Sequence, residues 1–143
     1  MNKLISDVCY LFGITGLSET IMIESGKKKR VLVVDDHSKV LKFIEIDLKL
    51  RGFEVFSAGS GKQALELFNS EKPDIVLLDM VMPEKDGFEV LRELRTFSKI
   101  PVIAFSASPS NQDPALRAGA NDFMHKPFNP EDMARKINTL LRV

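Results

Sequence analysis

Carboxylates follow two apolar runs of the chain, and this placement is the first sign of a chemical site. Asp35 and Asp36 come at the end of VLVVDD, and Asp79 ends IVLLD. A run that is apolar at every position is typical of a strand buried on both faces of a parallel sheet. The carboxyl ends of such strands are where α/β proteins place their chemistry. The alternative is that Asp79 begins a loop and hydrogen-bonds its own backbone.

Three carboxylates that converge on one rim repel one another by several kcal/mol, so a cation would have to offset them. A divalent ion with oxygen ligands, such as Mg²⁺, meets this need. Ser106 and Lys126 follow later apolar runs and would lie at the same edge. A carboxylate nucleophile, a metal ion, a lysine and a hydroxyl around one point form a phosphoryl-transfer site. Asp79 would accept the phosphoryl group there, while Mg²⁺ and Lys126 neutralise its oxygens.

The elements that must position these residues alternate between strand and helix patterns from residue 30 onward. Strand patterns lie at 31–35, 53–58, 74–79, 101–105 and 121–127. Helical patterns lie at 38–51, after a capping Ser60, at 87–97, at 114–118 and at 130–141. Strict alternation predicts an α/β fold, a doubly wound parallel sheet covered by helices on both faces. The leading topology is flavodoxin-like (βα)5 with strand order 2-1-3-4-5, which brings Asp35, Asp36 and Asp79 to one rim.

The composition limits the classes of partner and compartment. The chain has 143 residues, and Lys+Arg 20 balance Asp+Glu 20, so no net charge favours nucleic acid or an acidic membrane. The single cysteine, Cys9, excludes an internal disulfide framework and a cysteine-based zinc site. No apolar run reaches the length of a membrane span. The sequence therefore predicts a cytoplasmic protein with neither a membrane nor a nucleic-acid partner.

Four motifs, taken together, resemble the receiver domain of two-component response regulators. They are DD at 35–36, DMVMPEKDG at 79–87, SA at 106–107 and KPF at 126–128. Each is weak alone, but they stand in the family's order and at suitable spacing over residues 30–143. The resemblance implies that Asp79 is the phosphoacceptor. It also implies that Mg²⁺ is held directly by Asp36, through water by Asp35, and by the backbone carbonyl of Val81.

The resemblance also assigns the residues that would respond to phosphorylation. Ser106 would follow the phosphoryl group as the switch hydroxyl, and Phe123 would be the aromatic side chain that moves with it. Lys126 would pair with the phosphate, and the Lys126–Pro127 bond is expected to be cis, a state that only X-Pro bonds reach at low cost. Phe123 stands where receivers more often have tyrosine, so its two positions would differ in packing alone.

Two positions beside the site are expected to set the lifetime of the phosphoryl group. In receivers they lie two residues after the phosphoacceptor and two after the switch hydroxyl, and here they are Val81 and Ser108. Polar side chains at these positions orient the attacking water, which valine cannot do and serine reaches poorly. The sequence therefore predicts a phosphorylated form that is long-lived for a receiver.

The segment between Ser106 and Gly119 is shorter than is usual in receivers and contains Pro109 and Pro114. Because proline is tolerated in the first turn of a helix but not inside it, the fourth helix is expected to be short or to start late. Receivers commonly use this surface for output. The usual dimer through it is therefore not predicted, and monomer and dimer both remain alternatives.

Two apolar stripes lie outside the expected receiver core. Phe43, Ile46 and Leu50 form either a docking surface for the phosphodonor or a surface packed under the N-terminal segment. Residues 1–29 are expected to be an N-terminal extension to the receiver domain at 30–143. Its helical stripe comprises Leu4, Ile5, Val8, Leu11 and Phe12. The alternatives are a docking or dimerising helix, a helix folded back on the domain, and a true start at Met22.

The sequence as a whole predicts a stand-alone receiver rather than an enzyme. It would take a phosphoryl group from a histidine kinase or a histidine phosphotransfer protein, assist only its own phosphorylation and dephosphorylation, and signal by changing its downstream partner. One alternative is a receiver-like scaffold that is never phosphorylated. Another is a Mg²⁺-dependent phosphohydrolase, which needs a second acid where Val81 stands. His37, beside the acidic pair, could tune the metal or touch a partner, but the favoured interpretation is a solvated loop histidine. His125 is also expected to be exposed.

Overall fold

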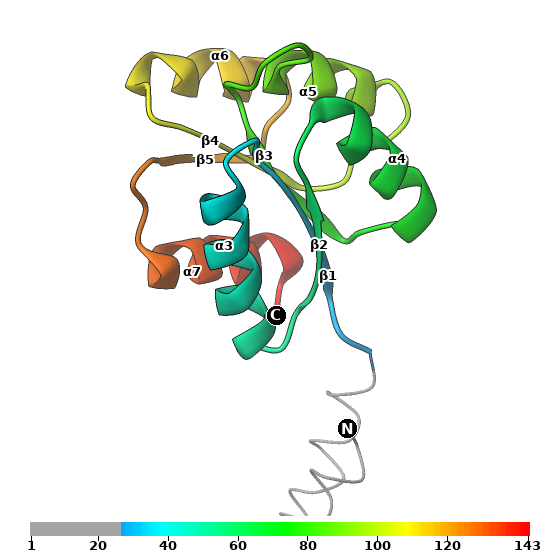
Figure 1. The fold of residues 1–143 in the computed structure, drawn as a ribbon, viewed down its shortest axis with the longest axis vertical. Coiled ribbons are helices and arrows are strands. Elements are labelled where there is room, and N and C mark those ends of the chain that lie inside the picture. Colours follow the sequence, from blue (N-terminus) through cyan, green and yellow to red (C-terminus); the bar gives the residue numbers. More distant parts are fainter. Residues whose placement is uncertain (1–26) are drawn as a thin grey trace, which may run out of the picture.

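The computed structural model describes residues 27–143, which form a five-stranded parallel sheet with helices on both faces (Figure 1). The strands are β1 (Arg30–Val34), β2 (Glu54–Ala58), β3 (Ile75–Asp79), β4 (Val102–Ser106) and β5 (Asp122–His125). Their order is β2-β1-β3-β4-β5, and every neighbouring pair is parallel. The predicted flavodoxin-like fold is confirmed.

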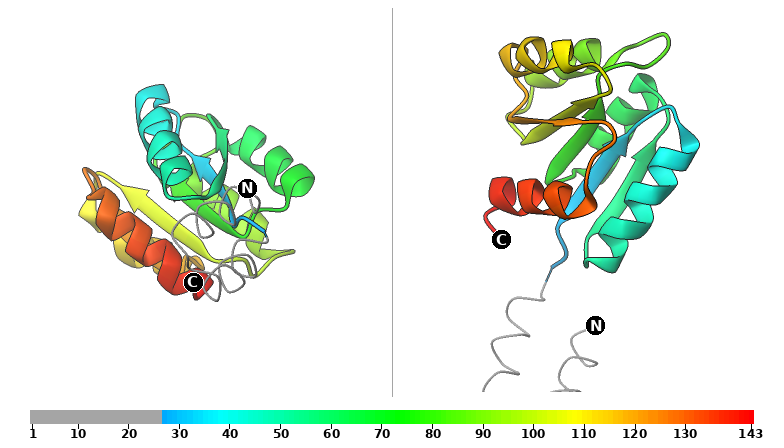
Figure 2. Two further views of the ribbon diagram at one scale, coloured as in Figure 1. Left: turned by 90° about the horizontal axis from the view of Figure 1, so that it is seen from below. Right: turned by 90° about the vertical axis from the view of Figure 1, so that its left-hand side faces the viewer.

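Helices cover both faces because the apolar side chains of each central strand alternate between two cores. The helices are α3 (Ser38–Leu50), α4 (Gly61–Glu71), α5 (Gly87–Arg95), α6 (Gln112–Arg117) and α7 (Pro130–Leu141), with a 3-10 turn, η1, at Pro109–Asn111. Val31 and Val33 of β1 belong to the core under α3 and α7. Leu32 and Val34 belong to the core under α4, α5 and α6. Figure 2 shows the sheet lying between these helices.

Two element boundaries near the expected site differ from the predicted ones. β4 ends at Ser106 rather than before it, so this hydroxyl belongs to a strand that is buried along its whole length. The fourth helix of the repeat, α6, begins at Gln112, ahead of Pro114, because proline fits the first turn of a helix. The 3-10 turn η1 precedes it and starts at Pro109. The helix itself is short, with 6 residues, as predicted.

The register of the sheet brings the predicted acidic residues to one edge. Val34 of β1 lies beside Leu78 of β3. Asp35 follows Val34, and Asp79 follows Leu78. The two aspartates therefore lie at the same level of the sheet.

The predictions for the N-terminal extension lie outside the described residues. This applies to the helical stripe and to the choice of start, so both stay predictions. Within residues 27–143, no helix combines the length and the apolar character needed to cross a membrane.

Candidate phosphoacceptor site

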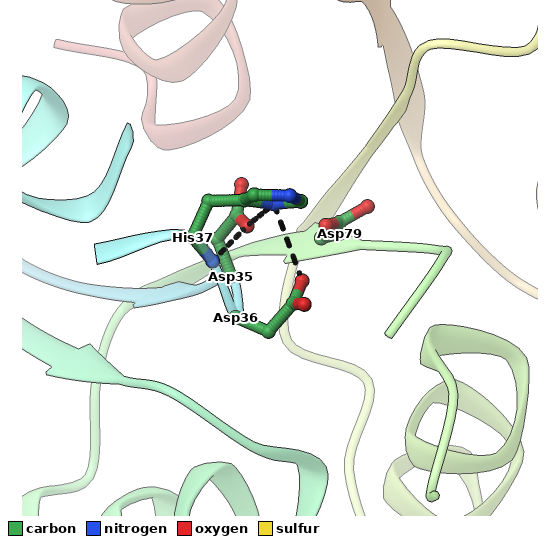
Figure 3. A group of neighbouring side chains, drawn as sticks. All are labelled: Asp35, Asp36, His37 and Asp79. Carbon is green, nitrogen blue, oxygen red and sulfur yellow. Dashed lines mark hydrogen bonds and ion pairs between the residues drawn. The ribbon is translucent and has the colours of Figure 1, made fainter. Parts of the chain in front are cut away.

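Four side chains gather at the carboxyl ends of β1 and β3 (Figure 3). They are Asp35, Asp36, His37 and Asp79, and one potential ligand atom from each lies within 4.8 Å of the others. Asp35 and Asp79 are almost wholly buried, with 0% and 2% of their surface exposed, whereas the Asp36 side chain is 25% exposed. The three carboxylates thus converge as the strand order predicts.

Lys126, which follows β5, places its ammonium between the two buried carboxylates. Its Nζ lies 2.8 Å from Asp35 Oδ2 and 3.2 Å from Asp79 Oδ2. The contact with Asp79 is a hydrogen bond, whereas the shorter one with Asp35 is an ion pair that is not aligned as a hydrogen bond. The Lys126–Pro127 peptide bond is cis, as predicted. The single ammonium of Lys126 therefore pairs with both buried carboxylates.

The surroundings of the two buried carboxyl groups push their pKa values in opposite directions. Burial raises the pKa of Asp79 to about 6, and the charge of Asp35 adds to this effect, against the Val81 N–H and Lys126. Burial also opposes ionisation of Asp35, but contacts with Lys126 and the His37 N–H hold the pKa of Asp35 below its ordinary value. Asp79 is therefore the carboxyl group that takes up a proton first.

The ammonium of Lys126 stays charged in this setting. Burial disfavours the charged form, yet Asp35 and Asp79 outweigh burial and raise the pKa of Lys126. Three carboxylates and one ammonium leave the rim with an excess of two negative charges above the pKa of Asp79.

The donor atoms at the rim fit a hard divalent cation. Asp36 Oδ1 is buried and has no hydrogen-bond partner, which is unusual for a buried carboxylate oxygen. Asp79 Oδ1 accepts the Val81 N–H at 3.0 Å, which holds the backbone of the following loop close to the carboxylates. Carboxylate and carbonyl oxygens are the ligands that Mg²⁺ prefers. The residues present, with their excess negative charge, therefore suit this ion.

The hydroxyl of Ser106 is buried and accepts two hydrogen bonds. The donors are the Ser108 N–H at 3.1 Å and the side-chain amide of Asn111 at 2.9 Å. With both lone pairs used, the hydroxyl proton is left to be donated, for example to a phosphoryl oxygen. Asn111 is absent from the residues that the sequence predicts for the site, because its approach to Ser106 depends on the path of η1. The hydroxyl of Ser108 shares a hydrogen bond with that of Ser110, with the two oxygens 2.7 Å apart.

Phe123, the predicted switch aromatic, lies in an inward position on β5. Only 5% of its surface is exposed, and it packs in the core under α4, α5 and α6. Its ring meets the His125 ring edge to face, with centroids 5.1 Å apart. His125 is exposed, as predicted, and its Nε2 also contacts Gln112 Oε1 of α6 at 3.2 Å. Movement of Phe123 on phosphorylation stays a prediction.

His37 is exposed, as the favoured interpretation expects, but it also contacts the acidic pair, as the alternative allows. His37 is the N-cap residue of α3, and its backbone N–H donates to Asp35 Oδ1 at 2.8 Å. Its Nδ1 lies 3.1 Å from Asp35 Oδ1 and 3.4 Å from Asp36 Oδ1, although the side chain is 65% exposed. The available signal was its position directly after the acidic pair, where the end of β1 turns back into α3.

The start of α5 packs closely against the end of β3. Asp86 caps this helix by accepting the Glu89 N–H at 2.9 Å. A Cβ at Gly87 would collide with the carbonyl oxygen of Asp79 and lie 2.5 Å from Met80 Cα. Glycine is therefore needed here because α5 and β3 approach each other so closely. Met80 is buried in the core.

Comparison with known proteins relates this geometry to a family. A family model described as the response regulator receiver domain matches residues 31–138. The "Probable transcriptional regulator ycf27" of Cyanophora paradoxa is 41% identical over 117 residues, which make up 80% of this chain and 49% of the relative. The protein of the same name from Porphyridium aerugineum is 37% identical over 118 residues, 81% of this chain and 49% of the relative. The chain thus spans about half the length of these curated relatives.

Solved structures give the same result. The receiver domain of the Francisella response regulator 1452 has a TM-score of 0.76 and 34% identity, covering 80% of this chain and 98% of that one. The BeF3-activated N-terminal receiver domain of Klebsiella pneumoniae RstA has a TM-score of 0.76 and 30% identity, covering 80% of this chain and 100% of that one. Sequence, fold and acidic rim agree: the chain belongs to the response regulator receiver domain family.

Proposed function

We propose that this receiver accepts a phosphoryl group on Asp79 from the phosphohistidine of a histidine kinase or phosphotransfer protein. The phosphorylated form then signals by binding a different partner. The observation that carries the proposal is that one ammonium contacts both buried carboxylates beside a buried Asp36 oxygen that accepts no hydrogen bond. This arrangement supports a nucleophile, Asp79, that faces positive charge on one side and a cation site on the other.

The transfer would be a displacement at phosphorus. A carboxylate oxygen of Asp79 forms the new O–P bond while the N–P bond of the phosphohistidine breaks, and the imidazole keeps the electron pair of that bond and takes a proton from water. The pKa of about 6 leaves Asp79 ionised at neutral pH, so the nucleophile is available.

The remaining residues would stabilise the charge on the transferred group. Asp36, Asp79 and the Val81 carbonyl would hold Mg²⁺, with Asp35 acting through water, and the bound ion would neutralise charge at the phosphoryl oxygens. Lys126 would pair with another of these oxygens, and Ser106 would donate its hydroxyl proton to a third. Charge placement of this kind needs no residue from the donor, so a small phosphodonor should also react.

Incubation with acetyl phosphate and Mg²⁺, followed by mass spectrometry, tests the proposal. We expect one phosphoryl group, located on Asp79 by peptide mapping and absent when EDTA removes the metal. Label on another residue would contradict the assignment of Asp79. No label from acetyl phosphate or from the histidine kinases of the source organism would instead favour the scaffold that is never phosphorylated.

A groove beside the site offers a place for the phosphodonor to dock. It has a volume of about 450 Å³ and runs between α3 and the loops after β4 and β5, with Phe43, Ala107 and Pro127 in its walls. Lys126 also lines it, so a histidine presented from this side would be close to Asp79. We propose that Phe43, together with Ile46 and Leu50 farther along α3, forms the docking surface. Their exposed fractions are 52%, 50% and 84%.

Replacing Phe43 by aspartate should slow phosphotransfer from the cognate histidine donor by about tenfold, since it places a charge in an apolar contact. The rate of labelling by acetyl phosphate should not change, because Phe43 does not contact the acidic rim. Phe97→Asp is the matched control: this phenylalanine is as exposed as Phe43, at 52%, and it neither lines the groove nor belongs to the proposed docking surface. Equal loss with both donors would mean that the variant is damaged rather than unable to dock.

The phosphorylated form should decay slowly, because the side chains beside the site do not orient water. Val81 is exposed at the rim but apolar, and the Ser108 hydroxyl is already paired with Ser110. Val81→Asn adds a polar group and should shorten the lifetime of the label by about tenfold. Val81→Ala adds none and should leave it unchanged. Decay is followed in Mg²⁺ alone, and an asparagine variant no faster than its parent would contradict the prediction.

The output of the receiver is part of the proposal. The curated relatives are named as probable transcriptional regulators, and we propose that this receiver also serves transcriptional control through its downstream partner. The sequence predicts no direct contact between the receiver and nucleic acid. A cytoplasmic location stays a prediction.

A further inference from the structure

His37 adds a nitrogen atom to a cluster that otherwise offers only oxygen. Its Nδ1 is 3.1 Å from Asp35 Oδ1 and 3.4 Å from Asp36 Oδ1, and one of its two ring nitrogens lies within 4.8 Å of a carboxylate oxygen of Asp79. Neighbouring ligands of an octahedral ion with bonds near 2.1 Å lie about 3 Å apart. The Nδ1 contacts, the shorter of which is a hydrogen bond here, therefore also have the length expected between atoms that share one ion.

Within residues 27–143, the one hydrogen bond of the imidazole is that between Nδ1 and Asp35 Oδ1, inside the cluster itself. His37 occupies the N-cap position of α3, yet its side chain makes no capping hydrogen bond. Figure 3 shows the ring lying over the carboxylates instead. Because the Asp35 carboxylate can only accept, Nδ1 carries the ring proton in this hydrogen bond. The side chain is 65% exposed, so the proton can move to Nε2, towards water, when a metal ion takes the Nδ1 lone pair.

We propose that His37 is an additional metal ligand and makes this rim favour divalent transition-metal ions, such as Ni²⁺, over Mg²⁺. The inference rests on the proposed cation site and names a ligand that the receiver resemblance does not assign. Carboxylates and carbonyls suit Mg²⁺, whereas imidazole suits nickel, zinc, copper and iron. A nitrogen donor next to Asp36 therefore raises the affinity for transition-metal ions more than it raises the affinity for Mg²⁺. Ni²⁺ is the useful probe because it is close to Mg²⁺ in size and differs mainly in its preference for nitrogen.

Calorimetric titration of the untagged full chain with Ni²⁺ and Mg²⁺ tests the proposal. His37→Ala should weaken Ni²⁺ binding by about tenfold or more, by analogy with the loss of residues that support metal ligands. It should change Mg²⁺ affinity by less than about twofold, because oxygen ligands remain. His125→Ala is the matched control, since His125 is the other histidine of the chain and faces Gln112 instead of the rim. It should leave both affinities unchanged.

A second readout follows the histidine rings directly. Paramagnetic Ni²⁺ should shift or broaden the NMR signals of the His37 ring at low occupancy, well before those of His125. Equal weakening of both ions in His37→Ala would overturn the proposal, because it would mean that His37 only positions the carboxylates. Unchanged Ni²⁺ affinity would also overturn it. Asp36→Asn tests the proposed cation site separately from the role of His37. If this variant binds Mg²⁺ as tightly as its parent, the proposed cation site itself is wrong.

Discussion

Replacing Asp79 by asparagine should abolish phosphoryl labelling and, at the same time, make the metal-free protein more stable. Loss of the label follows from loss of the nucleophile, so no residual label on this residue is expected. The gain in stability follows from the cost of keeping Asp79 charged. Its pKa of about 6 in the folded protein lies above its ordinary value of 3.8, mainly because the side chain is buried.

The direction of the pH dependence follows from this difference. Folding favours the protonated form of Asp79, so its contribution to the free energy of unfolding is fully present below pH 3.8 and is lost as pH rises through about 6. A shift of this size corresponds to about 3 kcal/mol. Asparagine keeps an oxygen that can accept the Val81 N–H but carries no charge. We therefore expect stabilisation of about 2 kcal/mol at pH 8 and little difference at pH 4.

Urea denaturation in EDTA at the two pH values measures this effect. Asp35→Asn is the opposing control, because the pKa of Asp35 is lowered and its ionised form is the one that the folded protein favours. The contribution of Asp35 is present above its ordinary pKa and lost as pH falls below it, so Asp35→Asn should destabilise the protein at pH 8. If Asp79→Asn is less stable than its parent at pH 8, this description of the rim is wrong.

The fold and the convergence of the carboxylates could be predicted because both follow from simple periodicity. Runs such as VLVV and IVLL must be strands buried on both faces, and strict alternation with helices leaves few topologies. Once β1 and β3 are neighbours, the residues that end them meet without any knowledge of side-chain conformations. The roles of Asp35, Asp36 and Asp79 in phosphorylation stay predictions that the proposed experiments test.

Features that depend on local backbone paths could not be predicted in the same way. Asn111 reaches Ser106 because η1 turns the chain back over the end of β4, and no hydrophobic pattern encodes that turn. The sequence favours a solvated loop position for His37, and the side chain is exposed, but its backbone N–H and its ring both bond Asp35 Oδ1, which no periodicity encodes. The docking groove likewise depends on how the loops after β4 and β5 approach Phe43.

Gly87→Ala should destabilise the protein by about 3 kcal/mol or more, because the added methyl group has no space. It would meet the carbonyl oxygen of Asp79 and Met80 Cα, which are backbone atoms at the end of β3 and cannot rotate away as a side chain can. Relief would require α5 to move away from β3, which would open the core around Val90 and Leu91. We expect the midpoint of thermal unfolding to fall by about 10 °C.

Gly59→Ala is the matched control for this steric argument. A Cβ there would have Gln63 Oε1 as its nearest neighbour, at 3.9 Å, and the backbone of Gly59 is in a conformation that other residues adopt. The stability of this variant should stay within about 1 kcal/mol of the parent or rise slightly, because alanine restricts the unfolded chain. The same displacement that destabilises Gly87→Ala would shift Asp79 relative to Lys126, so any folded fraction should also be labelled slowly by acetyl phosphate. Similar unfolding midpoints for the two variants would show that α5 can retreat from β3 at little cost, and the close approach at Gly87 would then not be what fixes the position of Asp79.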